Sequence, residues 1–316
     1  MTTPRRTRLL TALAATAATI AVLETAGRFA IPEAPPREDQ LVADPVLGWM
    51  LPEGPVMDWR GTQARINELG LRSQPPIQED GAIRILFVGD SSVFGDGVRD
   101  RQTMSDQLGQ RLVSRRLADV QNGGVPGFTC QQSTQLIARL SDRFQPQILV
   151  SYNMHSDFRR ASPEDRVMAE QQLGVLAGTG LGKLISAGTL QLRMWRKRPN
   201  HEAPVYEDCL RAMVKQQQAT GGRAVLVIPF TESDFPESPR YGVPEPDPPG
   251  TRLVDYRQAM RQVAQDTGSL LVDGPAVVTH SGLSQSEALQ DMVHPTARGH
   301  SLLAEAIAHA LWPEDQ

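Results

Sequence analysis

The stretch IRILFVGDSSVFG, residues 83–95, decides the fold. Residues 83–88 are strand-forming and almost entirely apolar, a pattern typical of a strand buried on both faces of a parallel sheet. The turn that follows, residues 89–92, is rich in residues that cap helices. Ser91 therefore lies at the carboxyl end of a predicted central strand, where open α/β sheets bind their ligands. Ser91 is a candidate nucleophile; the alternative is a connecting turn without a catalytic role.

Strands alternate with helices along the rest of the chain. We predict strands at 119–122, 147–152, 224–228 and 269–272, and helices at 103–116, 131–143, 206–218, 251–267 and 296–311. This alternation predicts an α/β fold in which helices cover both faces of a five-stranded parallel sheet, a three-layer α/β/α sandwich. The Pro-rich, acidic stretch 229–250 follows a strand and is interpreted as a lid or specificity element.

The composition is that of a globular protein. The 316 residues are 40% hydrophobic and 22% charged, and the net charge of −4 comes with no basic stripe, so we expect no nucleic-acid partner. The sequence contains no HExxH motif and no paired CxxC, and we predict neither a metal nor another cofactor. Cys130 and Cys209 are either two free thiols or one bridge, and the sequence leaves both possibilities open.

The first 31 residues have the pattern of an export signal. Arg5, Arg6 and Arg8 precede an apolar run, residues 9–23, that carries no charge until Glu24. The segment is either a cleaved signal peptide or an uncleaved signal-anchor, and the alternative is a disordered basic tail. The arginines favour a cytoplasmic amino terminus with the body of the protein outside, in the periplasm or at the cell surface. Residues 9–31 would then anchor the chain in the membrane.

Two further regions frame the predicted domain. Residues 32–80 are Pro-rich and are interpreted as a lead-in segment, and the main domain occupies residues 81–316. A polar, helical insertion interrupts the domain at about 158–202. Within it, residues 178–183 resemble a phosphate-binding loop, but no strand precedes them and the spacing is wrong. The basic run 193–198 is interpreted as a solvated helix end.

DMVHP, residues 291–295, is the second informative motif. Pro295 disfavours helical geometry at His294, so we expect a bent loop before the last helix. On such a loop the Asp291 carboxylate can reach Nδ1 of His294 and leave Nε2 free to take a proton from a serine. The alternative is a solvent-exposed acidic loop. Together with Ser91, the motif predicts a nucleophile, a base and an orienting carboxylate.

Four blocks together resemble the SGNH/GDSL hydrolase family: GDSS at 89–92, NGGVPG at 122–127, a short polar turn after the third strand, and DMVHP at 291–295. The chain is most similar to bacterial, amino-terminally anchored members, which have a lead-in like LGW…INELGLR. The resemblance covers residues 45–312. It implies a flavodoxin-like SGNH hydrolase fold and hydrolysis of acyl esters.

The resemblance also implies roles for individual residues. Ser91 would be the nucleophile, His294 the general base and Asp291 its orienting partner. The oxyanion hole would contain Gly127 and the N–H of Ser91.

The fourth block departs from the family's Gly-x-Asn-Asp pattern. Alignment on Asp157 puts Ser156 where the oxyanion asparagine belongs, with Asn153 three residues earlier. Either residue substitutes for the asparagine, or activity is weak, because one lost donor typically lowers turnover about 100- to 1000-fold. His155 is a candidate substrate contact.

We therefore expect an extracytoplasmic serine esterase without cofactor that cleaves short-chain acyl esters, such as acetyl esters, of glycans or lipids. The membrane would be its second partner, through the amino-terminal segment. Two alternatives stay open: an O-acyltransferase that uses the same acyl-enzyme, and a catalytically weak glycan-binding or scaffold protein on the same fold.

Overall fold

The computed structural model describes residues 5–30, 41–58, 60–77, 79–159, 176, 178–195, 199–243, 245 and 247–313. The chain divides into two compact units. One unit comprises residues 38–159 with 199–316, and the other comprises residues 1–37 with 160–198.

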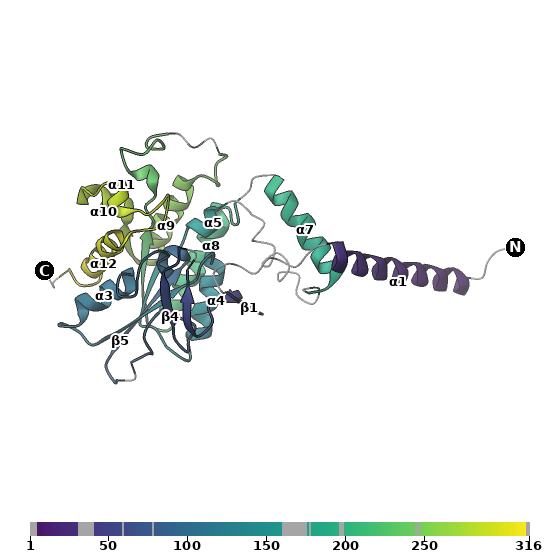
Figure 1. The fold of residues 1–316 in the computed structure, drawn as a ribbon, viewed down its shortest axis with the longest axis horizontal. Coiled ribbons are helices and arrows are strands. Elements are labelled where there is room, and N and C mark those ends of the chain that lie inside the picture. Colours follow the sequence, from purple (N-terminus) through teal and green to yellow (C-terminus); the bar gives the residue numbers. More distant parts are fainter. Residues whose placement is uncertain are drawn as a thin grey trace. The chain divides into compact units, whose positions relative to one another are not determined.

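A five-stranded parallel sheet forms the centre of the larger unit (Figure 1). Its strands are β5 (Ile83–Gly89), β6 (Ala118–Gly124), β7 (Ile148–Tyr152), β8 (Arg223–Ile228) and β9 (Leu270–Asp273). They are ordered β6-β5-β7-β8-β9, with Ile83 opposite Ala118 and Ile85 opposite Ile148. This is the flavodoxin-like order, and it confirms the predicted fold class.

Helices cover both faces of the sheet. One layer contains α3 (Met104–Leu112), α10 (Gly274–Ser281), α11 (Gln285–Ala288) and α12 (Ala297–Leu311), and the other contains α4 (Cys130–Leu140), α8 (Ala203–Ala219) and α9 (Leu253–Thr267). The short helices α2 (Ser91–Phe94) and α5 (His155–Phe158) follow β5 and β7. Because side chains alternate along a strand, Ile85 and Phe87 join the core under α3 and α12, whereas Leu86 and Val88 are buried on the opposite face.

Several element boundaries differ from the sequence-based prediction. Strand β6 continues through Gly123 and Gly124, because their backbones pair with Val88 and Gly89 and need no side chain. Helices α10 and α11 were not predicted. Gly274-Pro275 resembles a helix-breaking sequence. Helix α10 nevertheless begins with these two residues, because proline is well tolerated in the first turn of a helix.

The lead-in segment is packed against the domain. It forms two antiparallel pairs, β1 (Val42–Asp44) with β2 (Gly48–Met50) and β3 (Gly54–Met57) with β4 (Gln63–Ile66). The buried Arg72 guanidinium donates to the carbonyls of Phe94, Gly95 and Val98, at and beyond the end of α2. The lead-in therefore supports the helix that carries Ser91.

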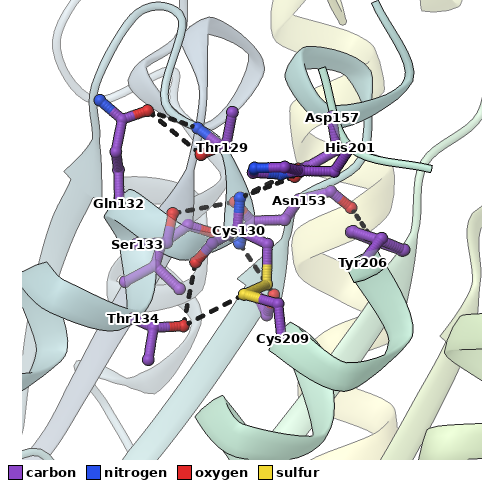
Figure 2. Close-up of a disulfide and its surroundings, with 12 residues drawn as sticks. Thr129, Cys130, Gln132, Ser133, Thr134, Asn153, Asp157, His201, Tyr206 and Cys209 are labelled. Atoms are coloured by element: carbon purple, nitrogen blue, oxygen red, sulfur yellow. Dashed lines mark hydrogen bonds and ion pairs between the residues drawn. A yellow bond between two sulfur atoms is a disulfide. The ribbon is translucent and has the colours of Figure 1, made fainter. Parts of the chain in front are cut away.

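The two cysteines form a single bridge. Cys130 at the start of α4 is bonded to Cys209 in α8, which links two neighbouring helices of one layer (Figure 2). Of the two possibilities that the sequence left open, the structure has the disulfide.

The smaller unit contains α1 (Arg5–Ala30) and α7 (Gly180–Trp195), which pack against each other. The helices approach so closely that a Cβ on Gly27 would lie 1.8 Å from the Gly180 carbonyl oxygen. The Glu24 carboxylate accepts a 3.0 Å hydrogen bond from the Leu181 N–H and so caps the start of α7. Residues Leu10–Ala30 are long and apolar enough to cross a membrane.

Most of the predicted insertion belongs to this smaller unit. Residues 160–175, 177 and 196–198 lie outside the described residues, and the last of these ranges belongs to the basic run 193–198. The phosphate-loop-like residues 178–183 lead into α7.

Candidate active site

Ser91 lies on the first turn after the interior strand β5. The Asp90 carboxylate accepts a 2.9 Å hydrogen bond from the Ser92 N–H and caps α2, in which Ser91 is the first residue. Gly95 ends α2 with a φ of 90°, a conformation that favours glycine. The turn therefore holds Ser91 at the carboxyl edge of the sheet.

The DMVHP loop brings His294 to Ser91. The Ser91 hydroxyl lies 2.8 Å from Nε2 of His294, and Nδ1 of the same ring lies 2.7 Å from Oδ2 of Asp291. Asp291 Oδ1 accepts 2.9 Å hydrogen bonds from the N–H groups of Val293 and His294, which fixes the bend of the loop. These contacts make a continuous line from hydroxyl to imidazole to carboxylate.

The charges around His294 favour its protonated form. Burial opposes a charge on the ring, but the hydrogen bond and charge of Asp291, together with the charges of Asp96 and Asp90, raise the pKa of His294 above its usual value. Burial also opposes ionisation of Asp291, yet hydrogen bonds from the His294 ring and the Val293 N–H hold the pKa of Asp291 well below its usual range. Asp291 is thus an ionised partner for a basic imidazole.

Arg60 of the lead-in segment also contacts Asp291. Its guanidinium donates to Oδ2, the oxygen that faces His294 Nδ1, and both side chains remain partly exposed. No sequence motif indicates this contact, and 231 positions separate the two residues.

Asp96 is a second carboxylate near His294, and it was not among the site residues predicted from the sequence. Its Oδ2 lies 3.9 Å from Nε2, and only 2% of the side chain is exposed. The Asp96 N–H donates to the Ser91 carbonyl, and its own carbonyl accepts from the Gln290 side chain. The Asp96 backbone thus links the turn that carries Ser91 (residues 89–92, the serine turn) to Gln290, which directly precedes the DMVHP loop. In the sequence, its one connection to the GDSS motif is its place in Gly95-Asp96-Gly97, which directly follows α2.

The loop 122–127 lies against the serine turn. The Val125 N–H donates to the Gly89 carbonyl, and a Cβ on Gly124 would lie 2.1 Å from the Phe94 nitrogen, so only glycine fits there. Gly127 has a φ of 79°. Trp49 of the lead-in holds this loop through a 3.0 Å hydrogen bond from Nε1 to the Pro126 carbonyl.

Asn153 is directed into the interior. Its side-chain N–H donates to the Ser151 hydroxyl at 3.0 Å. Its side-chain oxygen, Oδ1, accepts from the Ser133 hydroxyl (Figure 2). The residue is 1% exposed.

Ser156 lies next to the serine turn and is hydrogen-bonded to Asp90, a residue of that turn. Both its N–H and its hydroxyl donate to Oδ2 of Asp90, at 3.1 and 3.2 Å. The neighbouring Asp157 is buried and accepts hydrogen bonds from the Cys130 N–H and from Nδ1 of His201 (Figure 2). Residues 156–157 therefore tie the turn after β7 to the serine turn and to the start of α4.

His155 is buried beside the same turn. Its Nδ1 lies 3.3 Å from the Ser92 hydroxyl, and its ring packs edge-on against Tyr152. Burial lowers the pKa of His155 to about 4, and the charge of Asp90 only partly offsets this effect. The imidazole is therefore neutral at pH 7.

No group of three or more His, Cys, Asp or Glu side chains in the described part of the chain has the arrangement of a metal site. The chemistry available at this edge of the sheet is that of a serine hydroxyl beside an imidazole and a carboxylate. Such an arrangement can activate the hydroxyl as a nucleophile.

The sequence model of the GDSL-like lipase/acylhydrolase family matches residues 87–302. No curated protein matches the chain.

Among solved structures, the chain is similar to a mutant of Axe2, an acetyl-xylooligosaccharide esterase from a Geobacillus species (18% identity, TM-score 0.49, covering 74% of this chain and 96% of that one). It is also similar to LAE5, an α/β hydrolase from the metagenome of Lake Arreo (20% identity, TM-score 0.49, covering 72% of this chain and 94% of that one). A third similar structure is TesA (18% identity, TM-score 0.49, covering 73% of this chain and 98% of that one).

Proposed function

The chain belongs to the GDSL-like lipase/acylhydrolase family and is an ester-hydrolysing enzyme, and we propose that Ser91, His294 and Asp291 carry out its reaction. The observation that carries the proposal is the pair of short contacts of the His294 ring, 2.8 Å to the Ser91 hydroxyl and 2.7 Å to Asp291. A general base must lie within hydrogen-bond reach of the proton that it removes, and His294 meets this condition.

In the proposed first step, His294 takes the Ser91 proton through Nε2 as the serine oxygen attacks the ester carbonyl. Asp291 stabilises the imidazolium that forms. His294 then gives this proton to the alkoxide leaving group, and the acyl group stays on Ser91. In the second step His294 activates a water that hydrolyses the acyl-enzyme, and the proton returns to Ser91.

The oxyanion hole would use the N–H groups of Ser91 and Gly127, and Ser156 and Asn153 are the side-chain candidates for a further donor. Of these two, Ser156 needs less rearrangement, because rotation about one bond would redirect its hydroxyl from Asp90. The Asn153 amide would have to leave a buried network. His155 is proposed as a substrate contact, in its neutral form.

The substrate would be a short-chain acyl ester, such as an acetyl ester, of a glycan or lipid outside the cytoplasm. Two observations support the location: the apolar segment Leu10–Ala30 and the Cys130–Cys209 disulfide, since disulfides persist mainly in oxidising compartments. An acceptor sugar in place of water would make the enzyme an O-acyltransferase. The remaining alternative, a catalytically weak glycan-binding or scaffold protein on the same fold, is motivated by the departure of the fourth block from the family pattern.

We predict that Ser91→Ala lowers kcat on p-nitrophenyl acetate at least about 1000-fold, because no other hydroxyl replaces the nucleophile. Ser92→Ala is the matched control, since the Ser92 hydroxyl contacts His155 and the Val293 carbonyl rather than His294. We expect this control to retain activity within about tenfold, given that neutral hydrogen bonds contribute about 1 kcal/mol. Equal rates in wild type and Ser91→Ala would refute the assignment of the nucleophile. Acylation of an added glycan acceptor by the wild type would show that the enzyme is an O-acyltransferase.

We predict that Ser156→Ala lowers kcat by less than about tenfold, because the Ser156 hydroxyl donates to Asp90 in this structure. Removal of a true oxyanion donor lowers kcat about 100- to 1000-fold, so kinetics on the same ester distinguish the two roles. A loss in the larger range, with an unchanged thermal melt, would show that the hydroxyl turns to the oxyanion.

We predict that the full chain, produced in a bacterium, stays in the membrane fraction after an alkaline carbonate wash. Ile20→Arg should release it or abolish export, because arginine at the centre of a spanning helix costs about 2.5–3.5 kcal/mol. Protease added to spheroplasts should digest the domain. A soluble, shortened periplasmic chain would indicate signal cleavage, and a protected cytoplasmic chain would contradict the proposed location.

A further inference from the structure

His294 has a carboxylate near each of its ring nitrogens. Asp291 contacts Nδ1 at 2.7 Å, and Oδ2 of the buried Asp96 lies 3.9 Å from Nε2. The Asp96 carboxylate is thus close to the nitrogen that faces Ser91. In the proposed reaction this nitrogen gains a proton twice in each cycle.

We propose that Asp96 is a positioning residue that acts through His294, stabilising the imidazolium from the Nε2 side. The inference rests on the proposed function and adds a residue to it. An opposite charge within about 4–6 Å favours the charged form of a titratable group, and this effect is strongest where water is excluded. Asp96 meets both conditions, since it is close to the ring and 2% exposed.

Asp291 does not contact His294 alone. The Arg60 guanidinium contacts the same Asp291 oxygen that faces Nδ1, so a positive charge lies beside this carboxylate. Asp96 supplies negative charge on the opposite side, where its backbone is fixed by hydrogen bonds to Ser91 and Gln290.

Several other groups act on the same ring. These are Asp90 from the turn 89–92, His155 from the turn after β7, His300 from the last helix and Asp291 from its own loop, and Arg60 of the lead-in contacts Asp291. His155 and His300 are buried, and burial lowers their pKa values to about 4 and about 3. These two rings stay neutral over the pH range of the test. An effect of Asp96 is therefore separable from theirs.

The direction of the effect follows from the charges. The base is the neutral imidazole, so kcat/KM rises as pH increases through the pKa of His294. A nearby carboxylate raises that pKa. Replacing it by a neutral amide of the same shape should move the acidic limb of the profile to lower pH, and should also lower kcat because the imidazolium loses stabilisation.

The test is the variant Asp96→Asn in the full chain. We expect the acidic limb of kcat/KM on p-nitrophenyl acetate to shift down by about one pH unit and kcat to fall about tenfold. Asp80→Asn is the control. It removes the same charge from an exposed residue that precedes the amino end of β5, and it should change neither quantity.

Titration of the His294 ring by NMR provides a readout that does not depend on activity, with the signal assigned by its loss in His294→Gln. A downward shift of the His294 pKa in Asp96→Asn supports the coupling, whereas an unchanged pKa overturns it, whatever happens to kcat. If the wild type hydrolyses no ester, the proposed function fails, and the NMR titration still decides whether Asp96 acts on His294.

Discussion

The hydrogen bond between the Ser91 hydroxyl and His294 Nε2 is the constraint that the arrangement of the site has to satisfy. It joins residues 203 positions apart in the sequence. A parallel sheet makes this possible, because the carboxyl ends of all its strands lie at one edge. Ser91 follows β5 near the centre of the sheet, and His294 is carried on the loop between α11 and α12, which is bent by the Asp291 carboxylate. The same edge receives the turn after β7, which Ser156 ties to Asp90.

The lead-in segment stabilises this edge at three points. Arg72 holds the carbonyls around the end of α2, Trp49 holds the loop that carries Gly127, and Arg60 contacts Asp291. The segment interpreted from the sequence as a lead-in thus contacts three segments that form the site: the end of α2, the loop that carries Gly127, and the loop that carries Asp291. The proposed balance of charges around His294 follows from this arrangement, because the lead-in brings a cation to Asp291 and the loop after α2 brings the carboxylate of Asp96.

The sequence predicted the sheet well because buried parallel strands such as 83–88 are nearly uninterrupted apolar runs. It also predicted the contact of Asp291 with its own histidine, since the proline after His294 limits how the loop can bend. Arg60 and Asp96 could not be found in this way, because their positions depend on tertiary packing between distant segments. The directions of the Asn153 and Ser156 side chains could not be predicted from the sequence either. A sequence shows which polar groups are present but not which partner each will find, and here Ser133, Ser151 and Asp90 are those partners.

Labelling with a fluorophosphonate tests the central claim most directly, because such a reagent forms a covalent bond only with an activated serine. The account predicts one adduct per chain on the tryptic peptide 85–99, placed on Ser91 rather than Ser92 by fragmentation, and much slower labelling of a folded His294→Ala variant. An adduct on any other residue, or equal labelling of that variant, would contradict the account.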